Sequence, residues 1–98
     1  MTFRSRPHLN LCRTQPCVMC GMDDGSVCAA HSNLLEHGRG VGHKASDAAT
    51  ASLCHACHAA YDSGTRMSKD EKRLFILTAI VRTYIRFVED GKLVIAGK

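Results

Sequence analysis

Two C-x2-C pairs constrain the fold of this chain more than any other feature of its sequence. Cys17 and Cys20 form the first pair, Cys54 and Cys57 form the second, and residues 21–53 separate them. A two-residue spacer brings both sulfurs to one side of a turn, so two such pairs can complete a tetrahedral Cys₄ site for a structural zinc ion. The separation exceeds the roughly 15 to 20 residues of a simple zinc ribbon, which leaves room for a strand and a functional loop.

The two remaining cysteines, Cys12 and Cys28, lie outside the C-x2-C pairs. Cys12 precedes Cys17 by five residues and is an alternative to Cys17 as the fourth zinc ligand. Cys28 lies in the apolar run 27–30, where a thiol packs as a small core residue. A thiol redox centre at a C-x2-C motif is a further interpretation, but it requires a βαβ frame that this chain is too short to supply.

Length and composition indicate one small globular domain. The chain has 98 residues, of which 45% are hydrophobic and 22% are charged. A chain this short has a small hydrophobic core, which a structural zinc ion would stabilise. An 18-residue apolar window and a secretory h-region are both absent, so we expect a cytoplasmic protein without a membrane segment. Closely spaced cysteines in a reducing compartment are more often metal ligands than disulfides. The formal charge of +4 favours a polyanionic partner such as nucleic acid.

The single domain, residues 1–98, divides into a basic arm over 1–16, a zinc-stapled core over 17–64 and a helix over 68–91. The arm shows no helical period, so we expect it to be mostly irregular. Apolar runs bounded by turn residues predict strands in the core. The predicted order is a strand at 27–31, a loop at 32–49, a strand at 50–53 and a helix within 54–62. A loop of that length inside a compact domain usually has a function.

The clearest helix signal covers residues 69–90. Ser68 and Glu71 form a capping box before it, and Gly91 suits its C-terminal end. Its apolar stripe comprises Leu74, Leu77, Val81, Tyr84 or Ile85, and Val88, widened by Ile76, Ile80 and Phe87. So broad an apolar surface requires more than one partner, so we expect one side to cover the core and another to form a homodimer contact. The closing residues 93–96 are predicted to form a short edge strand.

Histidines are frequent, and two of them lie beside the cysteine pairs. His31 ends the first predicted strand, while His58 follows Cys57 on the predicted helix, with Asp62 one helical turn further on. A shared zinc ion would draw His31, the 32–49 loop and His58 toward a common centre. One imidazole could then hold a second metal ion and the other activate water, which is the arrangement of metal-assisted hydrolysis.

Four ordered motifs carry a resemblance to a known family. They are Pro16–Gly21, Ala29–Asn33, His37–Asp47 and Ser52–His58. Together they resemble the HNH nucleases of the ββα-metal (His-Me finger) superfamily. The resemblance is closest to the small phage and prophage YbcO-like branch, which includes the nuclease domain of the phage recombination enhancement protein. It covers about half of the chain and implies an α+β fold, with a small zinc-stapled ββα-metal core followed by a long C-terminal helix.

The resemblance implies a catalytic role for three residues. His31 is the general base that deprotonates the attacking water, which suits an imidazole with an unperturbed pKa of about 6.5. His58 is a ligand of a catalytic divalent ion, Mg²⁺, Mn²⁺ or Zn²⁺, which contacts the scissile phosphate and stabilises the leaving 3′ oxygen. Asp47 falls near the middle Asn of the HNH motif and either orients the base or ligates the metal.

Ala30 departs from the family pattern, because many HNH enzymes have a metal-binding Asp immediately before the base histidine. The ion would then be held by His58 together with Asp47 or Asp62. His37 and His43 are alternative ligands.

The loop between His31 and Asp47 has the composition of a phosphate-binding segment. Its glycines permit close approach of backbone amides to phosphate, and its basic side chains supply charge. The residues concerned are Gly38, Arg39, Gly40, Gly42 and Lys44.

We therefore expect a metal-dependent endonuclease that hydrolyses DNA phosphodiester bonds. The resemblance places it in phage or prophage recombination or replication, with a recombination protein as a further partner. The alternative is a non-catalytic zinc module that binds nucleic acid or a protein.

Overall fold

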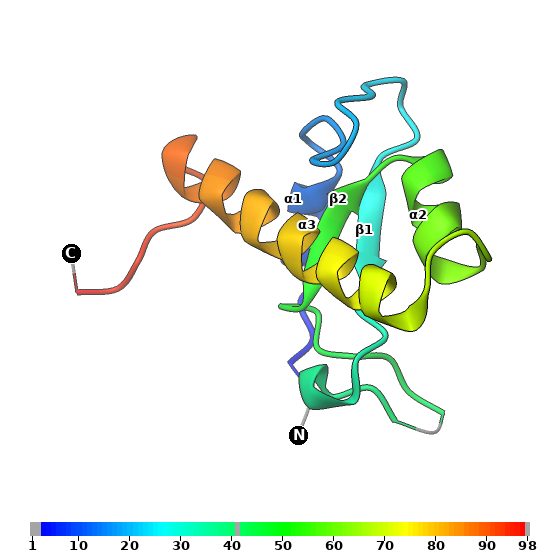
Figure 1. Ribbon diagram of the computed structural model, residues 1–98. Coiled ribbons are helices and arrows are strands. Elements are labelled where there is room, and N and C mark those ends of the chain that lie inside the picture. The colour runs from blue at the N-terminus through cyan, green and yellow to red at the C-terminus, as the bar shows by residue number, and fades with distance from the viewer. Residues whose placement is uncertain (1–2, 41, 98) are drawn as a thin grey trace.

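The computed structural model describes residues 3–40 and 42–97, and its centre is a two-stranded sheet (Figure 1). The elements in chain order are α1 Arg6–Cys12, β1 Cys28–His31, the 3-10 helix η1 Leu35–His37, β2 Thr50–Leu53, α2 His55–Asp62 and α3 Lys69–Glu89. β1 and β2 pair antiparallel, with Cys28 opposite Leu53 and His31 opposite Thr50. The prediction of a small α+β fold with a long C-terminal helix is confirmed.

Strand β2 is buried along its whole length because helices cover the edge that β1 leaves free. The Ser52 amide donates to Thr83 Oγ1 of α3 at 3.1 Å, and the Val18 amide donates to the Ser52 carbonyl at 3.0 Å. On the side of α1, Ser52 Oγ donates to the Cys12 carbonyl at 2.6 Å. The first two bonds satisfy backbone groups on the free edge of β2, an edge that would otherwise be open to pairing with another chain.

Helix α3 begins with the predicted capping box: the Glu71 amide donates to Ser68 Oγ, and the Ser68 amide donates to the Glu71 carboxylate. One face of the helix is buried and is formed by Ile76, Ala79, Thr83 and Phe87. Ile76 and Ala79 join the hydrophobic core together with Leu53 of β2 and Tyr61 of α2. None of the helices in the described residues combines the length and hydrophobicity needed to cross a bilayer.

The prediction of an irregular arm over residues 1–16 is wrong, because α1 occupies Arg6–Cys12. Ser5 caps this helix by accepting from the His8 amide at 3.3 Å, and Pro7 lies in its first turn. Seven residues show too few turns for a helical period, and a helix this short is stable only through tertiary packing. Here the packing comes from Cys12, which is fully buried, and from His8, which stacks on Tyr84 of α3.

The C-terminal edge strand predicted at 93–96 is also absent, since the sheet of the described residues has two strands. After Gly91, the amides of Lys92 and Leu93 both donate to the Phe87 carbonyl, which closes the end of α3. The segment that follows projects away from the sheet (Figure 1). Residues 1–2 of the arm, residue 41 of the glycine-containing loop and residue 98 lie outside the described residues.

Candidate metal centre and histidine cavity

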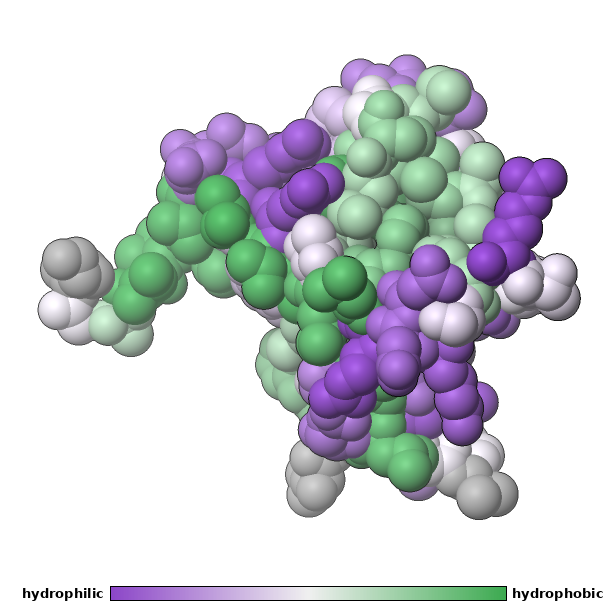
Figure 2. Space-filling view, in the orientation of Figure 1, coloured by the Kyte–Doolittle hydropathy of each residue, from purple (hydrophilic) through white to green (hydrophobic). Residues whose placement is uncertain are grey.

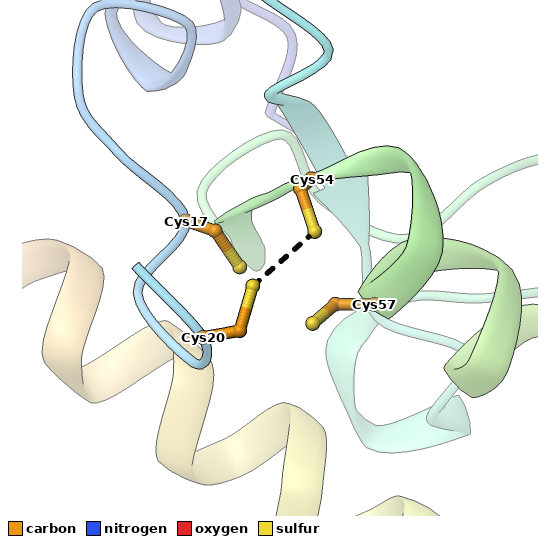
Figure 3. Close-up of side chains that lie close together, drawn as sticks. All are labelled: Cys17, Cys20, Cys54 and Cys57. Atoms are coloured by element: carbon orange, nitrogen blue, oxygen red, sulfur yellow. Dashed lines mark hydrogen bonds between the residues drawn. The ribbon is translucent and has the colours of Figure 1, made fainter. Parts of the chain in front are cut away.

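The four cysteines of the two C-x2-C pairs meet at one point (Figure 3). Their Sγ atoms all lie within 4.8 Å of one another, and the Cys20 and Cys54 sulfurs are 3.5 Å apart. A tetrahedral zinc ion with Zn–S bonds of about 2.3 Å requires sulfurs about 3.8 Å apart. The cluster therefore fits a structural metal ion such as zinc.

Local backbone structure sets the direction of these thiols. The Cys17 amide donates to the Met22 carbonyl and the Gly21 amide donates to the Cys17 carbonyl, so the first pair bends into a knuckle. Gly21 has φ of 80°, a left-handed conformation that glycine adopts without steric cost. Cys54 is the N-cap of α2, which places Cys57 in the first turn of that helix.

The charge state of the cluster favours a cation at its centre. Burial raises the pKa of Cys17, but backbone amides of Cys54, Cys20 and Met19 outweigh burial and lower that pKa to about 6. Burial and the three neighbouring thiols raise the pKa of Cys57 above its usual value. Thiolates that lie this close together repel one another, which disfavours deprotonation of more than one of them. A bound cation removes this repulsion and deprotonates the thiols that coordinate it.

The two cysteines outside the pairs take other roles. Cys12 is fully buried, and its sulfur lies 3.7 Å from Thr50 Oγ1, so Cys17 and not Cys12 belongs to the cluster. Cys28 was expected to be a plain core residue, but its Sγ lies 3.2 Å from His58 Nδ1. Because the Cys28 thiol is hydrogen-bonded to Nδ1 of His58, the other ring nitrogen, Nε2, is the one available to a ligand.

A separate cavity of about 520 Å³ brings the two predicted histidines together. His31 reaches it from the end of β1, and His58 reaches it from α2. The other charged or polar side chains that line it are Ser32, Asn33, Arg39, His43, Lys44 and Asp62. The prediction that His31, the loop and His58 lie around a common centre therefore agrees with the structure.

Asp47 lies behind His31 and is 4% exposed. Its Oδ1 accepts from His31 Nε2 at 2.8 Å and from Arg4 Nη1 at 3.0 Å, and its Oδ2 accepts from the Ser5 amide at 2.8 Å. Burial raises the pKa of Asp47, but the bonds from His31, Ser5 and Arg4 outweigh burial and hold that pKa below its usual value. A carboxylate that accepts the Nε2 proton leaves Nδ1 of His31 as the basic nitrogen.

Arg4 is a site residue that the sequence analysis missed. Besides Asp47, its guanidinium donates to the Ala45 carbonyl at 2.6 Å and to the Lys44 carbonyl at 2.8 Å. The N-terminal segment thus holds both the carboxylate behind His31 and the loop that carries Lys44. The cap signal Ser5-Arg6-Pro7 could have indicated an ordered segment here, although not its partner.

Asn33 is the second missed residue. Its Nδ2 donates to Asp62 Oδ1 at 3.2 Å, and its Oδ1 accepts from Arg39 Nη1 at 2.8 Å. Its amide donates to the Tyr61 hydroxyl at 2.8 Å, which fixes its backbone against α2. Asn33 therefore connects the basic side chain of the loop to the carboxylate of α2.

The loop glycines differ in their positions. Gly40 pairs with His43, and a Cβ at Gly40 would lie 2.6 Å from His43 Nε2, so a larger residue there would require the exposed His43 side chain to move. Gly40 and Gly42 line the cavity, and their role in phosphate binding stays a prediction. Gly38 instead ends η1 with φ of 94°. His37 bonds to Ser32 Oγ at 2.7 Å and lies outside the cavity lining, whereas His43 lies within it.

No known protein family matches this chain. Comparisons with curated proteins and with solved structures give no significant match either. Among residues 3–40 and 42–97, the four cysteines are the one group of three or more His, Cys, Asp or Glu side chains close enough to share an ion. A metal in the cavity would therefore have fewer protein ligands than the cysteine cluster offers.

Proposed function

We propose that the protein is a metal-dependent HNH-type endonuclease that hydrolyses DNA phosphodiester bonds in its histidine cavity. The observation that supports this function is the pairing of His31 with Asp47 at a cavity that also contains His58 and Asp62. Arg39 and Lys44 line the same cavity and supply the positive charge that a phosphate requires. A setting in phage or prophage recombination or replication, with a recombination protein as partner, belongs to the same proposal.

His31 is the general base of this proposal. Its Nδ1 accepts a proton from the attacking water, while its Nε2–H remains bonded to Asp47. The negative charge of Asp47 stabilises the imidazolium that forms, and the hydrogen bond keeps the ring in one orientation. Asp47 therefore acts on the base and not on a metal, because its two oxygens already accept three hydrogen bonds.

His58 and Asp62 would hold the catalytic divalent ion. They are one helical turn apart on α2, and both line the cavity. Two protein ligands suit Mg²⁺ or Mn²⁺, which keep several waters and bind substrate phosphate as further ligands. Such an ion supplies charge stabilisation at the phosphate and at the leaving 3′ oxygen. Ala30 supplies no ligand, because its methyl side chain has no donor atom, and it is fully buried in the hydrophobic core.

The test is cleavage of plasmid DNA by the His31→Ala variant over a titration of Mg²⁺ and Mn²⁺, with RNA as a parallel substrate. Loss of a general base should lower the cleavage rate about 10²- to 10⁴-fold. His55→Ala is the matched control, because His55 is exposed on α2 and lies outside the cavity lining. Zinc content and circular dichroism should remain unchanged in both variants. Equal cleavage by the wild-type and His31→Ala proteins would exclude His31 as the base.

The second candidate is a non-catalytic zinc module that binds nucleic acid or a protein. It is favoured by Ala30 and by the confinement of the metal-ligand cluster, within the described residues, to cysteines. This alternative predicts nucleic-acid binding without cleavage at any divalent ion concentration. The same titration therefore separates the two functions.

A further inference from the structure

The outer face of α3 carries an apolar stripe that the rest of the described chain leaves exposed. Its members are Leu74, Val81, Ile85 and Val88, whose exposed fractions are 68%, 58%, 49% and 40%. At 3.6 residues per turn they span about 60° of the helix circumference. Figure 2 shows an apolar run that follows α3 and continues into the C-terminal segment.

Most of the large apolar side chains that are exposed in the described residues lie on or next to this stripe. Val94 and Ile95 extend it with exposed fractions of 83% and 59%. Among residues 3–40 and 42–97, nine large hydrophobic side chains are exposed, and six of them belong to this helix face or to the segment after it. A contiguous exposed apolar patch in a small domain marks an interaction site.

A groove of about 410 Å³ adjoins the stripe near the first half of α3. Leu77, Ile80 and Val81 form its helix side, and Ala48 and Ala49 form part of its opposite side. The apolar surface is therefore wider here than along the rest of the helix. The rest of the opposite side is polar and consists of Glu36, His37 and Ser46. One copy of the chain thus presents both a groove with an apolar helix side and a projecting apolar segment.

We propose that this surface is the interface of a two-fold symmetric homodimer, in which α3 packs antiparallel against α3 of a second copy. Two charged residues, Arg82 and Glu89, support this arrangement. They are two turns apart along α3 and lie on the same flank of the stripe, at about 100° and 80° from Val81 around the helix axis. A two-fold axis near Ile85 places each Arg82 beside Glu89 of the second copy. Both charged residues are exposed. Arg82 Nη1 donates to the Val18 carbonyl of its own chain at 3.2 Å, which leaves its other guanidinium N–H groups for a carboxylate of the second copy.

A parallel pair would not match these charges. In a parallel pair, the flank of one helix that carries Arg82 meets the other flank of the second helix. That other flank includes Arg73, Ile80 and Tyr84 and has no acidic residue. Arg82 would then face no carboxylate. Charge complementarity therefore selects the antiparallel arrangement.

The same register gives the C-terminal segment a place to bind. With the axis near Ile85, residues of α3 whose numbers sum to 170 lie at the same level, so Glu89 at the end of one α3 lies level with Val81 of the other. The segment after Lys92 then runs toward the groove beside Leu77 and Ile80. Each copy supplies one segment and one groove, which is the self-complementarity of an isologous interface.

The first test is the molar mass of the full chain in solution, measured by light scattering and sedimentation in the high micromolar range. The wild-type protein should be a dimer. Ile85→Lys should raise the dissociation constant at least about 30-fold, because it introduces two facing charges at the centre of the interface. Leu35→Lys is the control, since Leu35 is 77% exposed and lies off the stripe. Circular dichroism should show unchanged folding in both variants.

The second test is a charge exchange that a general apolar association would not respond to. Arg82→Glu and Glu89→Arg should each weaken the dimer about tenfold, and the double variant should return close to the wild-type dissociation constant. Val94→Ser with Ile95→Ser should weaken it further. A monomeric wild-type chain, or an Ile85→Lys variant that still dimerises, would overturn the interface. A double variant without recovery would overturn its antiparallel register. The interface contains no residue of the cavity lining, so cleavage and dimerisation can fail separately.

Discussion

The cysteine cluster and the histidine cavity are built in different ways. Each cysteine pair is positioned by its own turn, and all four ligands have the same chemistry. The cavity instead takes side chains from β1, the following loop and α2. Hydrogen bonds from residues distant in sequence hold Asp47, His58 and Asp62. We therefore expect the cluster to contribute to the stability of the fold, and the cavity to the activity proposed above.

The largest expected effect is a loss of stability on removing a cluster ligand. Cys54→Ser should lower zinc stoichiometry and reduce the free energy of unfolding by more than about 4 kcal/mol, because metal binding at a structural site is folding free energy. Metal analysis combined with thermal unfolding followed by circular dichroism measures both quantities.

Cys12→Ala is the matched control for the cluster. Cys12 is also fully buried, but it lies outside the group of four. Its substitution should leave the zinc content unchanged and have the smaller cost of a core cavity. If Cys54→Ser were folded and as stable as the wild type without bound metal, the cluster would not be a structural metal site.

The second prediction concerns the cavity and should leave the cluster intact. Asp47→Asn removes the charge behind His31 and favours the wrong tautomer of its ring, so the cleavage rate should fall about 10²- to 10⁴-fold. The zinc content should not change. A variant that loses zinc together with activity would contradict the separation between the two regions.

Apart from α1, the features that depend on neighbours in the chain could be predicted from the sequence. The C-x2-C spacing identified all four cluster ligands, apolar runs placed both strands, and the capping box placed the start of α3. The position of His58 one turn before Asp62 follows from the same local geometry.

Features that depend on tertiary partners could not be predicted in this way. Nothing in the local sequence of Arg4 indicates that its guanidinium binds Asp47, since 43 residues separate them. Asn33 and Cys28 likewise gain their roles from side chains on α2. The prediction of an edge strand at 93–96 was wrong for the opposite reason. Its residues have strand propensity, but within the described part of the chain they pair with no strand.

The smallest expected effect tests how far the cavity depends on the N-terminal segment. Arg4→Ala removes one of three donors to Asp47 and the bonds to the Lys44 and Ala45 carbonyls, so cleavage should fall about tenfold, less than for Asp47→Asn. Arg6→Ala is the control, because Arg6 is exposed in the same segment. Cleavage rates at saturating divalent ion compare the three variants.

The stability cost of Arg4→Ala should also depend on pH in a defined direction. The pKa of Asp47 is lower in the folded protein than its ordinary value near 4, so its ionised form contributes stability above that ordinary value. This contribution is lost as pH falls through the folded pKa, where Asp47 becomes protonated and no longer attracts Arg4. The difference in unfolding free energy between wild type and Arg4→Ala should therefore be full at neutral pH and shrink in acid. Denaturant titrations at neutral and acidic pH measure it, and a difference independent of pH would mean that Arg4 acts through the loop carbonyls alone.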